Sequence, residues 1–205
     1  NTGGSLRFKH RVQRLYDMWL SVRPNLPMSE PAPDLSFLSK GSSAAAVGTL
    51  IDFGIRIDRQ GTWFHKGLPF TRPKLVKLFS TVLRRAPDGE YVLQTPVEKG
   101  RIEVEDAPFI AVEMIAEGAG RDLRLLFRTN IDTWVEAGPD NPIWFVYDES
   151  GEEPSPYIIV KPGIEARINR AIFYDLVELA DNEGDYFGVW AGGVFHPLGE
   201  AQEEE

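Results

Sequence analysis

The sequence predicts an α+β protein made of two related halves, each with antiparallel strands and one main helix. Two observations lead to this prediction. The segment Arg72–Tyr91 and the segment Arg167–Tyr186 share a pattern of matched residues at one constant offset. Short runs with strand-like alternation surround both segments, and turn residues separate these runs. Runs of short strands with one helix in each half favour α+β over a doubly wound parallel sheet.

The matched segments predict one helix each, with apolar residues at helical spacing. Thr71 is the expected N-cap of the first helix, with Pro73 in its opening turn. Each helix is expected to end near a glycine-bearing turn, before an aromatic-rich strand. The match between the two segments suggests an internal duplication. Helices that end in glycine turns before strands are common, so a chance match is the alternative. The matched pairs are Lys66/Lys161, Arg72/Arg167, Phe79/Tyr174, Val82/Val177, Gly89/Gly184 and Tyr91/Tyr186.

Strands are predicted on both sides of each helix. A hairpin is expected around Arg59-Gln60-Gly61, and Gly118-Ala119-Gly120 separates two later strands. We therefore place a first α+β domain at residues 35–119 and a second at 120–199. The predicted strands are 55–58, 62–65, 91–95, 101–104, 109–117, 122–128, 133–136, 143–147, 157–160 and 186–190.

Residues 1–34 form a basic N-terminal segment followed by a proline-rich linker, and residues 200–205 form an acidic tail. Apolar residues at helical spacing before Met28 predict an amphipathic helix. Such a helix can bind a membrane surface or a partner. It can also dock on the body of the protein, or be translated sequence upstream of a start at Met28.

The charge and composition exclude several classes of protein. The chain has 205 residues, a net charge of −9 and no cysteine. Disulfides, thiolate metal sites and thiol nucleophiles are thereby excluded. An acidic body repels phosphate backbones, so we expect no general nucleic-acid binding. No apolar run approaches the roughly 20 residues of a membrane span, and we expect a cytoplasmic protein.

The spacing of polar residues supports neither a metal site nor a catalytic site. The three histidines are scattered, without the paired spacing of a zinc site. No Gly-x-Gly-x-x-Gly run is present, and we expect no cofactor. No nucleophile–base pair is visible, so an enzyme is the least favoured class. For His65, a partly buried histidine bonded to the backbone is the alternative to a functional one.

Two features are candidates for ligand binding. A basic stripe on the first helix includes Arg72, at an expected helix N-terminus where backbone N–H groups favour anions. An ordinary solvated helix face is the alternative. The segment Thr95–Phe109 is rich in acids, but alternation points Glu103 and Glu105 towards solvent. Aromatic residues near these charges can stack on a planar ligand, although most are expected in the core.

Three runs resemble the uncharacterised bacterial family called domain of unknown function 1285. They are GTWFHKGLPFTRPKLVKLFSTVLR (61–84), DGEYVLQTPVEKGRIEVEDAPF (88–109) and GVWAGGVFHPLG (188–199). The resemblance implies a duplicated α+β core with a pleckstrin-homology-like second half. It also implies a ligand site between the halves, for a nucleotide-like or other anionic molecule, and a role in signalling. It carries over no catalytic residue.

We expect a small-molecule binding or sensing protein, with a protein–protein adaptor as the alternative. A pleckstrin-like half and exposed sheet edges suit an adaptor, because both can recruit peptides. The candidate ligand-binding residues are Trp63, His65, Lys66, Arg72, Tyr91, Thr95, Glu98, Lys99, Asp106 and Phe109.

Overall fold

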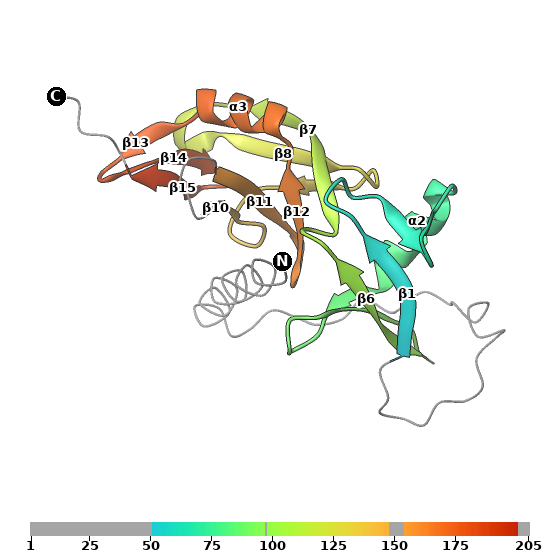
Figure 1. Cartoon of the computed structure of the whole chain (residues 1–205). Coiled ribbons are helices and arrows are strands. Elements are labelled where there is room, and N and C mark those ends of the chain that lie inside the picture. The colour runs from blue at the N-terminus through green and yellow to red at the C-terminus, as the bar shows by residue number, and fades with distance from the viewer. Residues whose placement is uncertain (1–50, 97, 148–153, 201–205) are drawn as a thin grey trace. The chain divides into compact units, whose positions relative to one another are not determined.

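The computed structural model describes residues 51–96, 98–147 and 154–200 (Figure 1). The chain divides into two compact units, Asn1–Asp106 and Ala107–Glu205. The described residues are mostly in β-sheet, with two α-helices: α2 (Pro73–Val82) and α3 (Arg170–Glu178). The predicted α+β class with one main helix per half therefore holds at this coarse level. The predictions for residues 1–34 and for the tail beyond residue 200 lie outside the described residues.

The first unit contains one six-stranded sheet in the order β3-β2-β1-β6-β5-β4. Neighbouring strands pair antiparallel, except that β1 and β6 run parallel (Figure 1). The strands alternate buried and exposed residues most clearly in β6, whose even-numbered positions face the core. Their bounds are β1 (Ile51–Ile57), β2 (Trp63–His65), β3 (Leu68–Pro69), β4 (Leu83–Arg85), β5 (Tyr91–Gln94) and β6 (Lys99–Val104).

The predicted hairpin around Arg59-Gln60-Gly61 is confirmed, because β1 pairs with β2 through Ile57 and Trp63. A second, tighter hairpin joins β2 to β3. Its two loop residues, Lys66 and Gly67, have φ values of 49° and 83°. Two consecutive positive φ values are typical of a type I′ turn, which matches the twist of the flanking strands.

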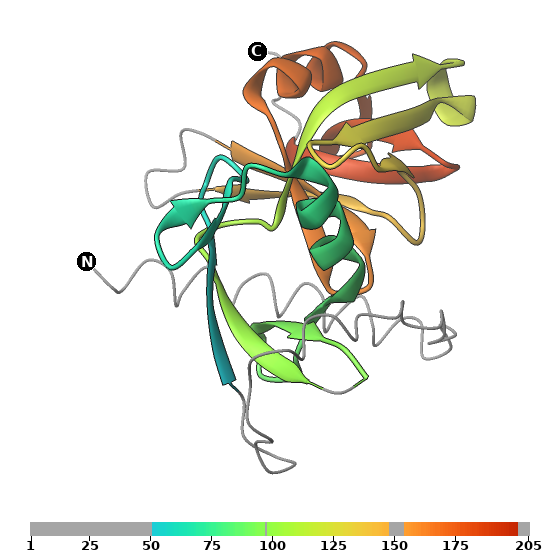
Figure 2. The same ribbon diagram turned by 90° about the vertical axis from the view of Figure 1, so that its right-hand side faces the viewer.

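Helix α2 is shorter than predicted and begins one residue later. Its N-cap is Arg72, which makes no side-chain cap bond, so the prediction that Thr71 caps the helix was wrong. Figure 2 shows α2 leading directly into β4. Residues from Leu83 onward leave the helix because they pair with β5. The turn at Gly89 therefore connects β4 to β5 and does not end the helix.

The second unit contains two sheets. A six-stranded sheet has the order β10-β11-β12-β7-β8-β9, and a three-stranded sheet has the order β13-β14-β15. All neighbours pair antiparallel except β12 and β7, which run parallel. The bounds are β7 (Phe109–Glu117), β8 (Arg124–Thr129), β9 (Trp134–Glu136), β10 (Ile143–Tyr147), β11 (Pro154–Lys161), β12 (Ile164–Ile168), β13 (Asp181–Glu183), β14 (Tyr186–Ala191) and β15 (Val194–Glu200).

The division between the units falls at Asp106–Ala107, earlier than the predicted boundary between residues 119 and 120. The glycines at 118 and 120 do not separate domains. They connect β7 to β8, which pair as one hairpin through Glu117 and Arg124. A short 3₁₀ turn, η2 (Gly120–Asp122), lies in this connection. Glycine-rich turns serve hairpins as readily as domain linkers, which is why the sequence signal was misread.

His196 joins the two sheets of the second unit. Its Nδ1 atom accepts a hydrogen bond from the backbone N–H of Ile143 on β10, at 3.2 Å. Its Nε2 atom lies 3.3 Å from the carbonyl oxygen of Ala191, to which it donates in this tautomer. The ring is 2% exposed, so both nitrogens are paired out of contact with water.

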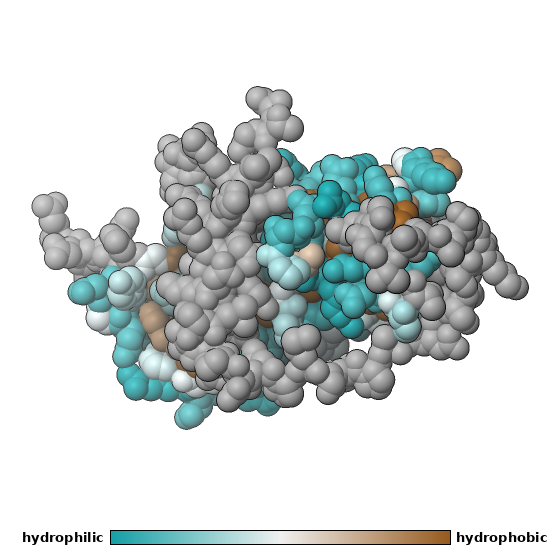
Figure 3. Space-filling model, turned by 90° about the horizontal axis from the view of Figure 1, so that it is seen from below, coloured by the Kyte–Doolittle hydropathy of each residue, from teal (hydrophilic) through white to brown (hydrophobic). Residues whose placement is uncertain are grey.

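On the face shown in Figure 3, hydrophilic side chains cover most of the described surface.

Candidate anion-binding groove

A groove with a volume of about 480 Å³ lies within the second unit. Strand pairing puts its parts together. Tyr157 on β11 pairs with Arg167 on β12, so the start of β11 and the end of β12 lie at the same end of the sheet. Helix α3 begins two residues after β12, and its first turns therefore lie at that end as well. The lining residues are Pro154, Ser155, Pro156, Arg167, Ile168, Arg170, Phe173 and Tyr174.

Two prolines set where the sheet ends. Pro154 and Pro156 pair with β10, but the pairing of β11 with β12 reaches only as far as Tyr157. A prolyl nitrogen has no hydrogen to donate, so it cannot support a complete ladder on both sides of a strand. The end of the sheet is therefore left open beside Ser155, and the groove lies there.

Helix α3 is anchored at its first residues by a side-chain cap. The Oδ1 atom of Asn169 accepts a hydrogen bond from the backbone N–H of Ile172, at 3.0 Å. This bond fixes the direction in which α3 leaves the sheet. Ile172 and Leu176 are buried on one face of the helix. Arg170, Phe173 and Tyr174 lie on other faces and line the groove.

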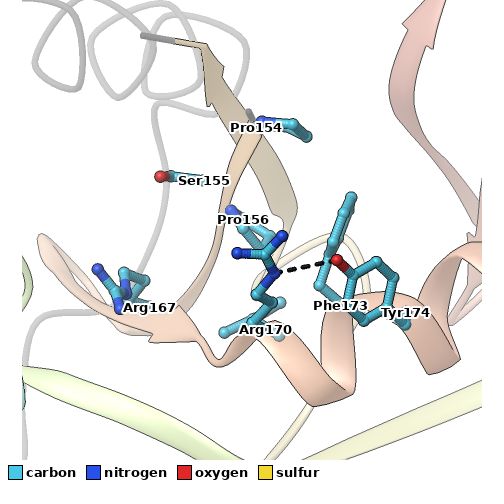
Figure 4. A pocket seen from close by; sticks show the side chains of 8 residues that line it. Pro154, Ser155, Pro156, Arg167, Arg170, Phe173 and Tyr174 are labelled. Carbon is cyan, nitrogen blue, oxygen red and sulfur yellow. Dashed lines mark hydrogen bonds between the residues drawn. The ribbon is translucent and has the colours of Figure 1, made fainter. Parts of the chain in front are cut away.

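The charge in the groove comes from two guanidinium groups. The Nε atom of Arg170 donates a hydrogen bond to the hydroxyl oxygen of Tyr174, at 3.0 Å (Figure 4). The same guanidinium lies 5.8 Å from the centre of the Tyr174 ring. Arg167 adds a second guanidinium, and both are charged at any physiological pH.

An aromatic wall borders the charged part of the groove. The ring centres of Phe173 and Tyr174 are 5.9 Å apart, and Phe145 supports Phe173 from β10 at 5.8 Å. Tyr174 is 52% exposed, about as much as Tyr186 elsewhere in the unit at 53%. The groove thus combines two cations, a hydroxyl at Ser155 and an exposed ring.

Three predicted site residues lie in the cores of their units. Trp63, Tyr91 and Phe109 are 2%, 3% and 1% exposed. Trp63 stacks on Phe79, with ring centres 6.4 Å apart. Tyr91 receives a hydrogen bond from Arg85 at 2.8 Å. These contacts explain why the sequence has large aromatic residues at these positions, since each contributes to the core.

Three other predicted residues lie close to one another in the chain and are exposed. His65 stacks on Phe70, with ring centres 6.3 Å apart. Lys66 is the first residue of the β2–β3 turn, and its backbone N–H donates to the carbonyl of Gly54. Arg72 is the N-cap of α2, and its carbonyl accepts bonds from the N–H groups of Leu75 and Val76 in the first turn. The role of these three in ligand binding stays a prediction.

The remaining predicted residues surround the β5–β6 connection and the end of the first unit. The Oγ1 atom of Thr95 accepts from the N–H of Glu98 at 2.9 Å and donates to its carbonyl at 3.1 Å. These bonds give Thr95 and Glu98 a structural role in the turn. Lys99 is exposed at the start of β6, and Asp106 is half-buried. Glu103 and Glu105 are exposed, as the strand alternation predicted.

None of the described residues that line the groove was among the sequence-based candidates for ligand binding. Arg167 was recognised only as the partner of Arg72 in the repeat. Arg170 and Tyr174 stand four residues apart on a helix, a spacing that brings side chains together and that the sequence does show. The proximity of Ser155 to them depends on the β11–β12 register, for which the sequence gives no local signal.

The described part of the chain has neither a metal-binding cluster nor a membrane-spanning helix. No group of three or more His, Cys, Asp or Glu side chains lies in an arrangement suited to a metal ion there. None of the helices among these residues is long and apolar enough to cross a membrane.

The fold and the groove define a protein of two units, mostly of β-sheet, with a basic and aromatic groove in the second unit. Sequence comparison identifies its family. The chain belongs to the DUF1285 family: residues 48–107 match its N-terminal domain, a domain of unknown function, and residues 108–198 match its C-terminal domain. The resemblance inferred from the three sequence runs is therefore confirmed.

Two solved structures are similar to this chain. A DUF1285 family protein from Silicibacter pomeroyi DSS-3 has 44% sequence identity and a TM-score of 0.69, covering 73% of this chain and 81% of that one. A DUF1285 family protein from Shewanella baltica OS155 has 30% identity and a TM-score of 0.49, covering 62% of this chain and 93% of that one. No curated protein matches the chain.

Proposed function

We propose that this protein binds a small anionic ligand in the groove of its second unit. The observation that supports this most directly is the presence of Arg167 and Arg170 in one groove with the hydroxyl of Ser155. Guanidinium groups bind phosphate and carboxylate through paired hydrogen bonds, which are stronger than bonds between neutral groups. A ligand-binding or sensing protein is the class that this groove suits best.

The position of the groove adds to its affinity for anions. It lies beside the first turn of α3, where the helix dipole favours negative charge. The chain as a whole has a net charge of −9. The attraction is therefore local, which suits a small anion better than a long polyanion.

We also infer that the two units arose by duplication. The order of elements supports this in part, because three strands follow each helix, although three strands precede α2 and six precede α3 in its unit. Arg72 and Arg167 occupy matched positions before the two helices. The likeness of the second unit to pleckstrin-homology-like folds, a ligand site between the halves and a role in signalling stay predictions.

The proposal is tested by titrating the whole protein with inorganic phosphate at low salt and following backbone amide signals by NMR. We expect saturable shifts centred on residues 166–174. Arg167→Ala and Arg170→Ala should each weaken binding by about tenfold, since each removes a charge-assisted hydrogen bond. Arg59→Ala is the control, because Arg59 is exposed in the first unit. Shifts that do not saturate, or that the groove variants leave unchanged, contradict the proposal.

A further inference from the structure

The six-stranded sheet of the second unit has an inner and an outer face. On β10, the Phe145 ring lies 5.8 Å from the ring of Phe173 on α3. The hydroxyl of Tyr147, on the same side of β10, donates a hydrogen bond to the carbonyl of Leu198 on β15. Helix α3 and the three-stranded sheet therefore lie on the inner face. Side chains alternate along a strand, so Trp144, next to Phe145, points to the outer face.

The outer face of β10, β11 and β12 is buried. Trp144 pairs with Tyr157 on β11, and their ring centres are 5.7 Å apart. Two residues further along β11, Ile159 pairs with Glu165 on β12. Tyr157, Ile159 and Glu165 are only 2%, 6% and 2% exposed. The indole nitrogen of Trp144 is buried too, without a hydrogen-bond partner among the described residues.

The outer face of β7, β8 and β9 is exposed by contrast. Leu125 and Phe127 on β8 are in the core, so Leu126 and its partner Ile115 lie on the outer side. Ile115 is 41% exposed, and Trp134 on β9 is 44% exposed. Something therefore covers half of this face, and the described helices and strands of the second unit do not. The exposed fractions are those of one chain, so the cover belongs to the same chain and not to a second copy.

We propose that residues 5–20 form this cover, as an amphipathic helix docked on the outer face of β10, β11 and β12. A helix of this length measures about 24 Å, and the eight residues of β11 measure about 27 Å. The proposal is independent of anion binding in the groove. The apolar stripe that would contact the sheet consists of Val12, Leu15, Tyr16, Trp19 and Leu20.

Charge favours this segment over the other parts of the chain outside the described residues. Residues 1–27 contain five Lys and Arg and one Asp, in a chain whose net charge is −9. The covered face includes the carboxylate of Glu165, and burying a carboxylate is costly unless cations or donors accompany it. A basic segment meets that need. Residues 148–153 and 201–205 are acidic and would repel it.

The connection to the body of the protein is long enough. Residues 28–50 separate the segment from β1 and span up to roughly 75 Å when fully extended. The core of the second unit lies on the inner face of the sheet. We therefore expect the unit to stay folded when the segment leaves the outer face.

The test uses the absence of cysteine from the chain, which makes one introduced thiol a specific reporter. Ile159→Cys places a thiol on the covered face of the whole protein, and its rate of reaction with a maleimide is measured. Adding Leu15→Asp should speed this reaction by about tenfold or more, because an unpaired carboxylate disfavours the apolar contact and opens the site.

Three controls isolate the effect. Ile158→Cys, at a position 0% exposed on the inner face, should react slowly with or without Leu15→Asp. Ile115→Cys, at an exposed position, should react fast in both backgrounds. His10→Asp adds the same charge as Leu15→Asp on the opposite side of the predicted helix. It should leave the rate at position 159 unchanged.

Three results overturn the proposal. The thiol at position 159 may react as fast as that at position 115 in the absence of Leu15→Asp, which means that the face has no cover. Leu15→Asp leaving the rate unchanged means that another part of the chain covers the face. His10→Asp acting as strongly as Leu15→Asp means that the apolar stripe is not the contact.

A milder variant decides the case in which Leu15→Asp also exposes the thiol at position 158. Leu15→Ala removes apolar contact without adding a charge. Faster reaction at position 159 with an unchanged rate at position 158 supports the docked helix. Unchanged rates at both positions contradict it.

Discussion

At the scale of single residues, His196 shows how one buried ring can make a fold sensitive to acid. Its Nδ1 atom accepts a hydrogen bond from Ile143, so that nitrogen must be unprotonated in the native state. Burial lowers the pKa of His196, and this effect outweighs the bond to the Ala191 carbonyl that raises it. The folded protein therefore resists protonation at a site that the unfolded chain protonates normally.

We predict that the protein loses stability as the pH falls through about 6.5, the ordinary pKa of histidine. Below that value the unfolded state takes up a proton that the native state does not, so the free energy of unfolding decreases. The loss levels off once the pH passes the lowered pKa of the folded state. One such proton changes stability by at most about 1.4 kcal/mol per pH unit.

Denaturant unfolding between pH 7.5 and 5 measures this loss. His196→Gln should reduce the slope of the free energy of unfolding against pH. His65→Gln, at an exposed position, should leave that slope unchanged. NMR titration of the His196 ring in the native protein is a check that needs no variant. A ring that titrates at 6.5 or above in the folded protein contradicts the prediction.

At the scale of elements, the two helices begin in different ways. Asn169 caps α3 through its side chain, whereas Arg72 stands at the N-cap of α2 without such a bond. Arginine has no acceptor atom, so it cannot satisfy a backbone N–H at the start of a helix. The first turn of α2 is therefore less well stabilised than that of α3.

We predict that Asn169→Ala lowers the free energy of unfolding by about 1 kcal/mol, and that Arg72→Ser raises it by a similar or smaller amount. The first change removes the bond to Ile172, and the second supplies a bond that α2 lacks. Urea denaturation followed by circular dichroism measures both. A stabilising Asn169→Ala or a strongly destabilising Arg72→Ser is inconsistent with these caps.

Strands and helices with a clear hydrophobic periodicity were predictable from the sequence. Strands that form only because a neighbouring strand pairs with them were not. Strands β7 and β10 were predicted with their observed bounds, because both are runs rich in apolar residues. Strand β13 is polar and exposed throughout, so it has no alternation. Strand β15 contains Pro197, which argues against a strand unless it lies at an edge, as it does here.

The candidate site was harder to predict than the elements. The residues that line the groove come from two strands and a helix, and only their pairing brings them together. Sequence reasoning instead favoured Trp63 and Tyr91, whose aromatic character proves to serve the core of the first unit. A basic residue before each helix was the one feature of the sequence that pointed towards Arg167.

At the scale of the whole molecule, the chain is divided into units that match separate family domains. The structural division falls at Asp106–Ala107, and the family domains meet between residues 107 and 108. Every described residue that lines the groove belongs to the second unit. The binding function proposed above is therefore expected to belong to that unit alone.

We predict that a shortened protein of residues 107–205 folds and binds inorganic phosphate within about threefold of the full chain. A threefold change corresponds to less than about 0.7 kcal/mol, which is the size of a surface effect. Circular dichroism checks folding, and the NMR titration of the full chain is repeated. A folded fragment that has lost binding contradicts the placement of the site.

The two parallel strand pairs have a consequence for how the chain acquires its structure during synthesis. β1 must wait for β6, and β7 must wait for β12, because each parallel partner emerges from the ribosome only after several intervening elements. Closing such long loops slows folding. The first unit can complete its sheet once Val104 has emerged, well before β12 exists. The growing chain therefore passes through a stage with one finished sheet and a β7 that lacks its parallel partner, β12.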